Sequence, residues 1–219
     1  MLAELNRRAR YILASQGIVS LFKRISSYFL GYIFRFNVYG IKRHFPQLAG
    51  RLDPSNFLPH VIDHDFFAVK DNKEAGDLEK RGFEFRSRVF RAKEALDHGG
   101  VALIVFIDHE IASINWIATN SRLQKIFDDP PHKVDYSAGE AIICGAATFP
   151  KFRQKGLYTY NLFKAFEYLA STGNEKCISF TAKNLPIYGI SERLFGSKLI
   201  GYGYWLRILG INFYWEKRV

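Results

Sequence analysis

The segment from residue 141 to residue 181 constrains the fold most, because it reads as a strand, a loop, a helix and a second strand. Residues 141–149 are mainly apolar and of strand length, and residues 157–171 repeat large apolar side chains at helical spacing. Residues 176–181 again have strand character. Two strands joined through a helix lie parallel in one sheet. The segment therefore predicts an α/β fold built on a mixed sheet.

Strand and helix signals continue through the rest of the chain. Asp71, with Glu74 three residues later, forms the pattern of a capping box that opens a helix. Residues 108–110 have the polar character of a hairpin turn. The further expected elements are strands over 61–70, 101–107, 111–118, 202–205 and 211–215, and helices over 71–98 and 186–195.

The first 51 residues carry most of the net positive charge. They contain nine Lys and Arg residues against one acid, Glu4, whereas the whole chain has 31 Lys and Arg against 21 Asp and Glu. Such a segment is either a solvated helical face or a surface for an anionic membrane, a nucleic acid or another polyanion. The sequence leaves these readings open.

The same segment has the apolar spacing of helices. Residues 2–16 and 18–36 repeat apolar side chains every three or four positions, and the second stretch is amphipathic. Such a helix packs on a domain or lies on a bilayer. We expect a helical extension over residues 1–50 and one domain over residues 51–219, and peripheral membrane contact through residues 1–45 is one reading of the extension.

Composition bounds the compartment and excludes several kinds of site. Cys144 and Cys177 are the two cysteines and form no CxxC pair, so we expect no disulfide scaffold. No uncharged apolar run reaches the roughly 18 residues of a spanning helix, and no signal peptide is apparent. We expect a cytoplasmic protein that contacts at most the inner face of the membrane. His60 and His64 have no further metal-ligand pattern beside them, so we expect no metal site.

The loop between residues 149 and 157 has the residues of an anion site. Helix starts expose unpaired N–H groups and carry partial positive charge, so they bind phosphate. Arg153 and Lys155 add positive charge at the same point, and Gly156 lets the backbone approach an anion closely. The sequence therefore predicts a phosphate-binding strand–loop–helix unit.

Pro150, Arg153 and Gly156 also stand in the order of a known motif. Their spacing resembles the pyrophosphate motif of the GNAT superfamily of acyl-CoA N-acyltransferases, which runs Val-x-Pro-x-x-Arg-x-x-Gly-x-Gly/Ala. Thr148 stands where Val is usual, and Tyr158 departs from the usual Gly or Ala. The departure at Tyr158 concerns the close approach of one amide to the pyrophosphate.

A second element supports this resemblance. Asn184 follows the next strand, and Leu194-Phe195-Gly196 ends the next helix, which is similar to the Asn…Leu-Gly-Phe element of the family with the glycine one position late. The resemblance covers residues 61–215 and is specific in 141–200. The basic N-terminal segment is similar to helical extensions of some bacterial members, among them a branch associated with surface-polysaccharide biosynthesis.

The resemblance implies a fold and a coenzyme. The fold is a splayed mixed β-sheet flanked by helices, with acetyl-CoA or another acyl-CoA as co-substrate in the V between strands 141–149 and 176–181, and no metal. Gly145 would mark the bulge that helps to splay the sheet. The residues implied to hold the coenzyme are Ala147, Thr148 and Phe149 near the thioester, Arg153, Gln154, Lys155, Gly156, Leu157 and Tyr158 at the pyrophosphate, and Asn184.

The implied reaction is the transfer of an acetyl or other acyl group to a small amine, such as an amino sugar. The usual general acid of the family is a Tyr on the helix after the coenzyme-binding Asn, and here Tyr188 is the first choice and Ser191 the second. Glu140 is the expected base, because it starts the strand that lines the cleft. Asn115 and Trp116 are expected to shape the acceptor pocket.

Two alternatives to this enzyme stay open. The position at which the family carries its acid holds no Tyr, which favours a catalytically inactive GNAT-fold module that docks on a membrane or a polyanion through its basic N-terminal helices. An aminoacyl-tRNA-dependent relative of the same fold would leave the coenzyme motif without a use, so we expect no nucleic-acid partner. The sequence does not fix the oligomeric state.

Overall fold

The computed structural model describes residues 33–61, 63–127 and 131–219, together with Leu13, Ile18, Val19, Phe22 and Ser26. The helix expected over 2–16 and most of the helix expected over 18–36 lie outside the described residues. At the end of the second stretch, strand β1 (Phe34–His44) replaces the expected helix. Its apolar and polar residues alternate, and it pairs with β6 (Cys177–Ala182) in a sheet, which overrides the helical spacing.

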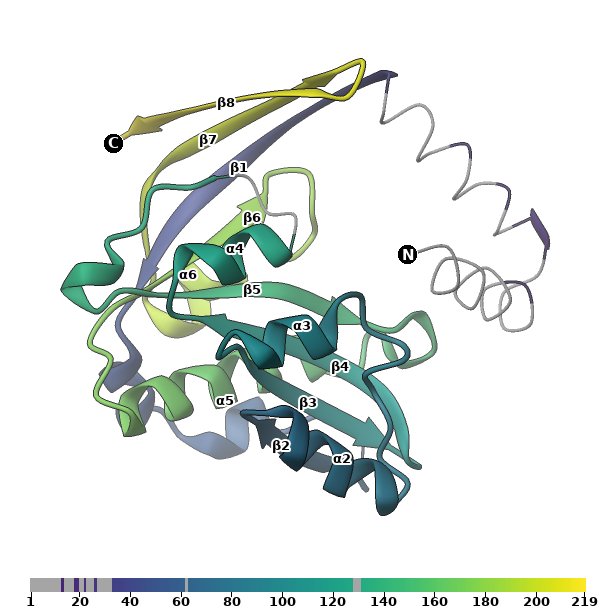
Figure 1. The fold of residues 1–219 in the computed structure, drawn as a ribbon. Helices are drawn as coiled ribbons and strands as arrows, with labels where there is room; N and C mark the ends of the chain where they lie inside the picture. The colour runs from purple at the N-terminus through teal and green to yellow at the C-terminus, as the bar shows by residue number, and fades with distance from the viewer. Residues whose placement is uncertain are drawn as a thin grey trace. The chain divides into compact units, whose positions relative to one another are not determined.

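Eight strands in the described part of the chain form one mixed sheet in the order β2-β3-β4-β5-β6-β1-β7-β8 (Figure 1). The α/β fold with a mixed sheet is thereby confirmed. The remaining strands are β2 Asp65–Val69, β3 Val101–Ile107, β4 Glu110–Ala118, β5 Ala141–Thr148, β7 Lys198–Ile208 and β8 Ile211–Arg218. The helices are α2 Asn72–Lys80, α3 Ala92–Asp97, α4 Ser121–Ile126, α5 Leu157–Ser171 and α6 Ile190–Phe195, with 3-10 turns η1 Pro46–Arg51, η2 Pro54–Phe57, η3 Tyr136–Ala138 and η4 Pro150–Phe152.

Contacts within the chain divide it into two units. The larger unit comprises residues 39–203 and 216–219, and the smaller unit comprises residues 1–38 and 204–215. Most of β1 and all of η1 lie in residues 39–51, so this part of the expected helical extension belongs to the larger unit as strand and 3-10 helix.

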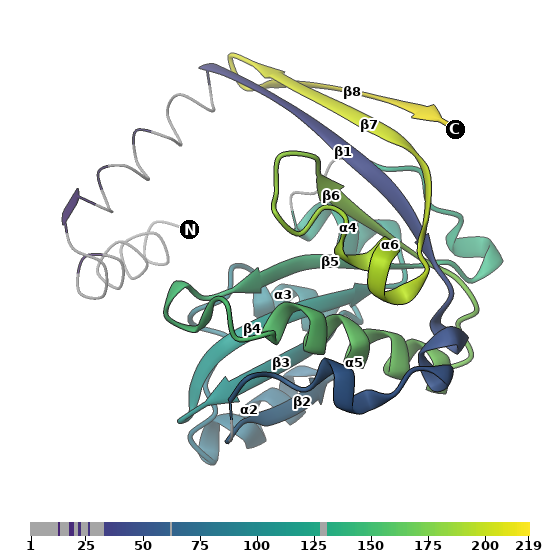
Figure 2. The ribbon, with the colours of Figure 1, turned by 180° about the vertical axis from the view of Figure 1, so that it is seen from behind.

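In the larger unit, helices cover both faces of the sheet (Figures 1 and 2). Helices α2, α3 and α4 cover one face, over a core that contains Phe85 and Trp116. Helices α5 and α6 cover the other face, over a core that contains Phe166. Strand β5 serves both cores, because Ile142 points to the first and Ile143 to the second.

The parallel crossover β5–α5–β6 is present as the sequence predicted. Helix α5 spans the expected residues and buries Leu162, Phe166 and Leu169 against the sheet. Its one fully buried polar side chain among the described helix residues, Asn161, donates from Nδ2 to Leu103 O on β3 at 3.1 Å. This bond ties the start of α5 to the centre of the sheet.

The helix expected over residues 71–98 is interrupted. Its start is confirmed, because Glu74 N donates to Asp71 Oδ1 at 2.8 Å and Lys70 N donates to Glu74 Oε2 at 2.7 Å. Helix α2 then ends, and Gly82 has a φ of 90° that a helix does not allow. The residues between α2 and α3 include Phe85, which is fully buried, so core packing decides against helical continuity.

The helix expected over residues 186–195 begins only at Ile190. The preceding residues form successive turns, in which Leu185 N donates to Ala182 O at 3.0 Å and Tyr188 N donates to Leu185 O at 3.0 Å. The strands at the end of the chain are longer than expected, and β7 and β8 are neighbours at the edge of the sheet.

Candidate functional site

Strands β5 and β6 pair only at their first residues and then separate. The parallel register runs from Ala141 opposite Cys177 to Ile143 opposite Ser179 and ends there, although β5 continues to pair with β4 up to Thr148. On its other side β6 pairs with β1 along its whole length, from Cys177 opposite His44 to Ala182 opposite Tyr39. On the side facing β6, the second half of β5 therefore has no strand partner among the described residues, at the place where the resemblance expects a V.

A bulge in β5 lies at this edge. Two residues of β5, Gly145 and Ala146, stand opposite the single residue Asn115 of β4, where the register shifts. Gly145 has a φ of 57°, in the left-handed region that suits glycine. Both bulge residues are exposed, whereas the first half of β5 is buried. The bulge expected at Gly145 is thus confirmed, and the exposed backbone starts two residues earlier than the sequence analysis placed it.

Phe149 is expected near the thioester, and its backbone makes two hydrogen bonds just after the end of β5. Its N–H donates to Ala112 O at 2.9 Å, and its carbonyl accepts from Phe152 N at 2.9 Å. Both backbone groups are therefore engaged within the protein. The carbonyl of Ala147 accepts from Ser113 Oγ at 3.2 Å. Residues 145–147 are the exposed part of β5.

The loop after β5 leads into the start of α5 through two residues with positive φ. Gln154 has a φ of 63° and Gly156 a φ of 73°. At the start of α5, Tyr160 N donates to Gly156 O at 3.0 Å, and no side chain caps the helix. The N–H groups of Leu157 and Tyr158 thus lack intrahelical acceptors, as at any helix start.

Basic side chains surround this helix start. Arg153 is exposed, and its Nε donates to Thr148 O at 3.3 Å, which places its side chain beside the end of β5. Lys155 Nζ lies 5.6 Å from the centre of the Phe152 ring. A helix dipole, uncapped N–H groups and two cations in one place form an electropositive site for a phosphate group.

His60 is a neighbour of the loop that the sequence analysis did not connect with it. Its N–H donates to Lys155 O at 2.9 Å, and a Cβ placed on Gly156 would lie 3.4 Å from His60 Cδ2. The His60 side chain is exposed. No sequence pattern joins His60 to residue 156, because the contact depends on how the segment after η2 crosses the start of α5.

Tyr158 is largely buried, against the core under α5. Burial raises the pKa of Tyr158 to about 12, so its hydroxyl stays protonated. Its side chain packs against the edge of this core.

Asn184 follows β6 in an exposed turn, as expected, but the turn is not yet part of the helix. Ser191 is buried on α6, and its carbonyl accepts from Ser197 N at 3.3 Å. Tyr188 lies in the turns before α6, over Gly40 of β1: a Cβ on Gly40 would lie 2.6 Å from the Tyr188 hydroxyl oxygen. Burial raises the pKa of Tyr188, and the neighbouring Tyr202 and Glu192 add to the rise.

Lys42 is a buried charged residue beside Tyr188 that sequence reasoning missed, and His44 is buried two residues further along β1. Lys42 is fully buried, with its Nζ 4.3 Å from the centre of the Tyr188 ring and 3.8 Å from Glu192 Oε1. The last distance is too long for a direct hydrogen bond. Burial lowers the pKa of Lys42, and Glu192 partly offsets that effect. Lys42 pairs with Ser179, the β6 residue at which β5 and β6 separate.

Glu140 lies at the closed end of the β5–β6 pair. Its carboxylate accepts from Arg43 Nη2 at 3.1 Å and from Asp135 N at 3.1 Å. Five residues of strand separate it from Gly145, which is roughly 16 Å at 3.3 Å per residue. The ion pair and this separation do not favour Glu140 as a base that contacts a thioester at the bulge.

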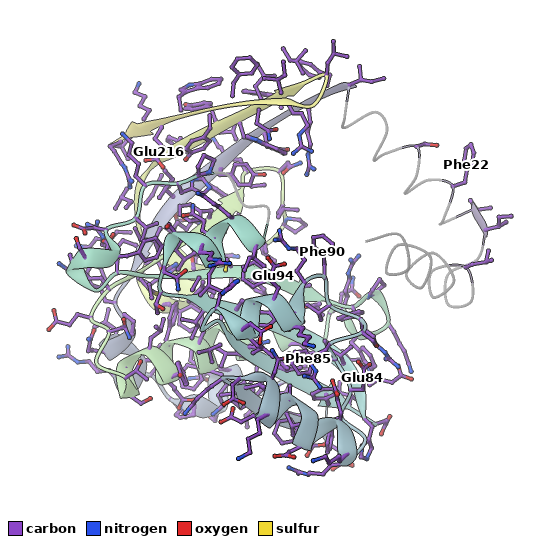
Figure 3. All side chains as sticks on the ribbon, viewed as in Figure 1. Phe22, Glu84, Phe85, Phe90, Glu94 and Glu216 are labelled. Carbon is purple, nitrogen blue, oxygen red and sulfur yellow. The ribbon has the colours of Figure 1, made fainter. Side chains whose placement is uncertain are left out.

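A cavity of about 950 Å³ opens beside Glu140, on the face of the sheet opposite α5. Basic side chains dominate the charged part of its lining, which includes Arg43, Lys133, Lys176 and Arg218 together with the acids Asp135 and Glu140. Glu216 lies next to this cavity near the end of β8 (Figure 3), where it accepts from Lys133 N at 2.8 Å.

Asn115 and Trp116 are in the interior of the larger unit. Trp116 is fully buried in the core and lies 5.1 Å from the Phe127 ring. Asn115 is also buried, and its Nδ2 has no hydrogen-bond partner among the described residues. Both residues lie on β4 next to the bulge of β5, and neither lines the described cavity.

The structure thus brings together one part of the expected site. The β5 edge, the basic loop and the start of α5 adjoin each other, and Asn184 follows the neighbouring strand. Glu140 lies at the other end of β5. Asn115 and Trp116 are buried on the neighbouring strand β4. Among the described residues no group of three His, Cys, Asp or Glu side chains is placed to hold a metal ion, and no helix there has the length and apolarity to cross a bilayer.

No family model matches the chain, and no curated protein matches it. Solved structures match at low similarity. A functionally unknown conserved protein from Staphylococcus epidermidis is 15% identical with a TM-score of 0.45, over 84% of this chain and 64% of that one. A protein of the GNAT family from Novosphingobium aromaticivorans is 14% identical with a TM-score of 0.44, over 78% of this chain and 65% of that one. A GCN5-related N-acetyltransferase from Kribbella flavida is 12% identical with a TM-score of 0.39, over 80% and 60%.

The chain therefore has structural neighbours among GNAT-family acetyltransferases, at low identity. It spans less than two thirds of the length of each of the three structures. All three TM-scores are low, so a functional assignment has to come from the geometry of this chain.

Proposed function

We propose that this protein binds acetyl-CoA or another acyl-CoA along the open edge of β5 and transfers the acyl group to a small amine. The observation that carries the proposal is the separation of β5 from β6 after Ile143, directly before a basic loop and an uncapped helix start. An extended thiol-bearing arm fits an exposed strand edge, and a pyrophosphate fits the helix start.

In this proposal the backbone of residues 145–147 binds the pantetheine arm. The N–H groups at Gln154–Tyr158, with the side chains of Arg153 and Lys155, bind the pyrophosphate. Asn184 contacts the coenzyme from the turn after β6. Holding both substrates in one geometry is worth about 7–11 kcal/mol of a two-substrate barrier, so positioning supplies much of the catalysis.

The reaction forms a C–N bond between the amine and the thioester carbonyl carbon and breaks the C–S bond. The amine loses a proton, and the departing CoA thiolate gains one. We assign the proton donor to Tyr188 and place Ser191 second, because the raised pKa of Tyr188 keeps its hydroxyl protonated and Ser191 is buried on α6. The acceptor is an amine, of which an amino sugar is one example, and its base is left open, because Glu140 lies far from the bulge.

The coenzyme site is tested by thermal unfolding with and without acetyl-CoA. A ligand at a hundredfold excess over its Kd stabilises by about 2.7 kcal/mol, which for a chain of this size raises the midpoint by about 5–10 °C. We expect this rise in the wild-type protein and its loss in Arg153→Glu. Arg122→Glu is the matched control, because Arg122 is exposed on α4, whose apolar side chains pack on the opposite face of the sheet from α5.

Turnover is then measured as release of free thiol in a screen of amines, with Tyr188→Phe beside the wild type. Loss of turnover with an unchanged midpoint shift would separate chemistry from binding. If neither acetyl-CoA, CoA nor a longer acyl-CoA raises the midpoint of the wild type, the proposal is wrong.

A further inference from the structure

The smaller unit exposes large apolar side chains at the start of β1 and along the hairpin of β7 and β8, from its turn to Trp215. Leu209 N donates to Ile33 O at 2.9 Å, which holds the start of β1 against this turn. Figure 3 shows bulky side chains projecting from this end of the strands. We call the group the apolar tip, and its residues with their exposed fractions are Ile33 41%, Phe34 60%, Phe36 48%, Ile208 40%, Leu209 64%, Ile211 63%, Phe213 49% and Trp215 47%.

The turn at the apolar tip carries a leucine in a conformation that leucine rarely adopts. Leu209 has a φ of 48° and Gly210 a φ of 82°, the signs of a two-residue hairpin turn that favours Asn-Gly or Asp-Gly. A bulky residue with positive φ costs energy. Backbone preference therefore does not explain why a leucine stands at position 209. The feature that leucine adds there is an exposed apolar side chain.

Among the described residues of the smaller unit the charged side chains are Arg35 and Arg207, and both are basic. The chain has no Asp or Glu between Glu4 and Asp53, and none between Glu192 and Glu216. The smaller unit as a whole has seven Lys and Arg residues against one acid, a net charge of +6. An exposed apolar surface with basic and no acidic side chains beside it among the described residues fits a partner that is both apolar and anionic.

Two arginines combine these properties at the apolar tip. The guanidinium groups of Arg35 and Arg207 lie 5.2 Å and 4.7 Å from the centre of the Trp205 ring. Arg207 Nε donates to Asn212 Oδ1 at 2.7 Å across the hairpin. Side chains of this kind lay their stems along apolar surface and hold their charge at a lipid headgroup.

Aromatic residues are placed in the same way. Trp215 stacks on Tyr204 across the hairpin, with ring centres 5.4 Å apart and an angle of 8° between the rings. Trp and Tyr are enriched at the boundary between hydrocarbon and water, because one end of each side chain is apolar and the other polar. Ile18, Val19 and Phe22 of the same unit are exposed as well.

We propose that the apolar tip docks on the surface of an anionic lipid bilayer, with Leu209 and Ile211 entering the boundary between headgroups and acyl chains. A second copy of the chain fits this surface less well, because it would bring two units of the same strong positive charge together. The lipid supplies the opposite charge and the apolar layer at once. This inference is independent of acyl transfer.

The test uses the full chain and two kinds of vesicle, one of phosphatidylcholine and one in which about a third of the lipid is phosphatidylglycerol. We expect cosedimentation with the anionic vesicles, weakened by salt, and little with phosphatidylcholine alone. Trp116 and Trp205 are buried and Trp215 is half exposed, so binding should shift the emission of Trp215 to shorter wavelength, and brominated lipid should quench it.

The variant that tests the apolar tip is Leu209→Asp with Ile211→Asp. Both side chains are exposed, and Asp tolerates the positive φ at position 209, so the fold should persist. Losing two inserted side chains should weaken vesicle binding at least about tenfold. The matched control is Leu58→Asp with Leu194→Asp, two exposed leucines of the larger unit, which should bind vesicles as the wild type does.

Three results would overturn the proposal. The first is a wild type that does not bind anionic vesicles, and the second is unchanged binding by Leu209→Asp/Ile211→Asp, which would leave the binding to other basic residues. The third is wild-type self-association that the same double variant abolishes, which would make a second copy the occupant. Quenching of Trp215 by brominated lipid needs no variant, so it decides the matter even if the double variant fails to fold.

Discussion

At the scale of single residues, the buried side chain of His44 makes the stability of the protein depend on pH. Its Nδ1 lies 2.5 Å from Ser197 Oγ and its Nε2 2.7 Å from Ser179 Oγ. Burial, with the charge of Lys42 as a second cause, lowers the pKa of His44 from 6.5 to about 3. Between these two values the unfolded chain binds a proton that the folded chain does not. The free energy of unfolding therefore falls as the pH falls from 6.5 toward 3.

The measurement is urea unfolding of the wild type and of His44→Gln from about pH 7 down to about pH 4.5. In the wild type, His44 should remove about 1.4 kcal/mol of stability for each pH unit below 6.5. His44→Gln is less stable at neutral pH but should lose less stability on acidification. His60→Gln, at an exposed histidine, should keep the wild-type slope, and equal slopes in all three proteins would contradict the assignment.

At the scale of elements, the bulge in β5 depends on glycine for two separate reasons. Gly145 has a positive φ, and a Cβ there would lie 2.9 Å from Trp116 Cδ1 and 3.1 Å from Phe127 Cδ1. Gly139 has a φ of 74°, but a Cβ there meets nothing within 4 Å. A side chain would thus meet the same backbone strain at both glycines, but a steric clash only at Gly145.

Gly145→Ala and Gly139→Ala form a matched pair in urea unfolding. The positive φ should cost each variant roughly 1–2 kcal/mol. Gly145→Ala should lose a further ~1–3 kcal/mol, because its methyl group overpacks the core against Trp116. Equal losses in the two variants would mean that the ring of Trp116 gives way without cost and that the bulge tolerates a side chain.

The elements of the proposed coenzyme site were the easiest to predict from sequence. Local periodicity predicts each of the elements β5, α5 and β6, and the parallel crossover follows from chain geometry. The break between α2 and α3 and the turns before α6 were not predicted. Between α2 and α3 the packing of Phe85 in the core competes with helical spacing and wins.

At the scale of the whole molecule, the two units should differ in local stability. Strands β3 and β4 lie inside the sheet and are buried over nearly all of their residues, whereas β8 is an edge strand with mostly exposed side chains. Local opening is easiest where few apolar contacts have to be broken. The hairpin over residues 204–215 should therefore open long before the centre of the larger unit.

Amide hydrogen exchange followed by mass spectrometry checks this expectation. Peptides from β3 and β4 should exchange slowest in the chain, and peptides from residues 204–215 should exchange fastest among the strands. Anionic vesicles should slow exchange in residues 204–215 and leave β3 unchanged, if the apolar tip docks on lipid. Uniform protection across all strands would show that the two units open together.

The sequence by itself determined the crossover, the hairpin between β3 and β4, the capping box at Asp71 and the basic loop before α5. These features depend on residues close together in the chain, where periodicity, turn chemistry and handedness act directly. Only the tertiary structure decided that β1 lies beside β6, and that His44 meets Ser179 and Ser197 across 135 and 153 residues. Contacts over such separations depend on which sheet edge a strand joins, and no local pattern encodes that choice.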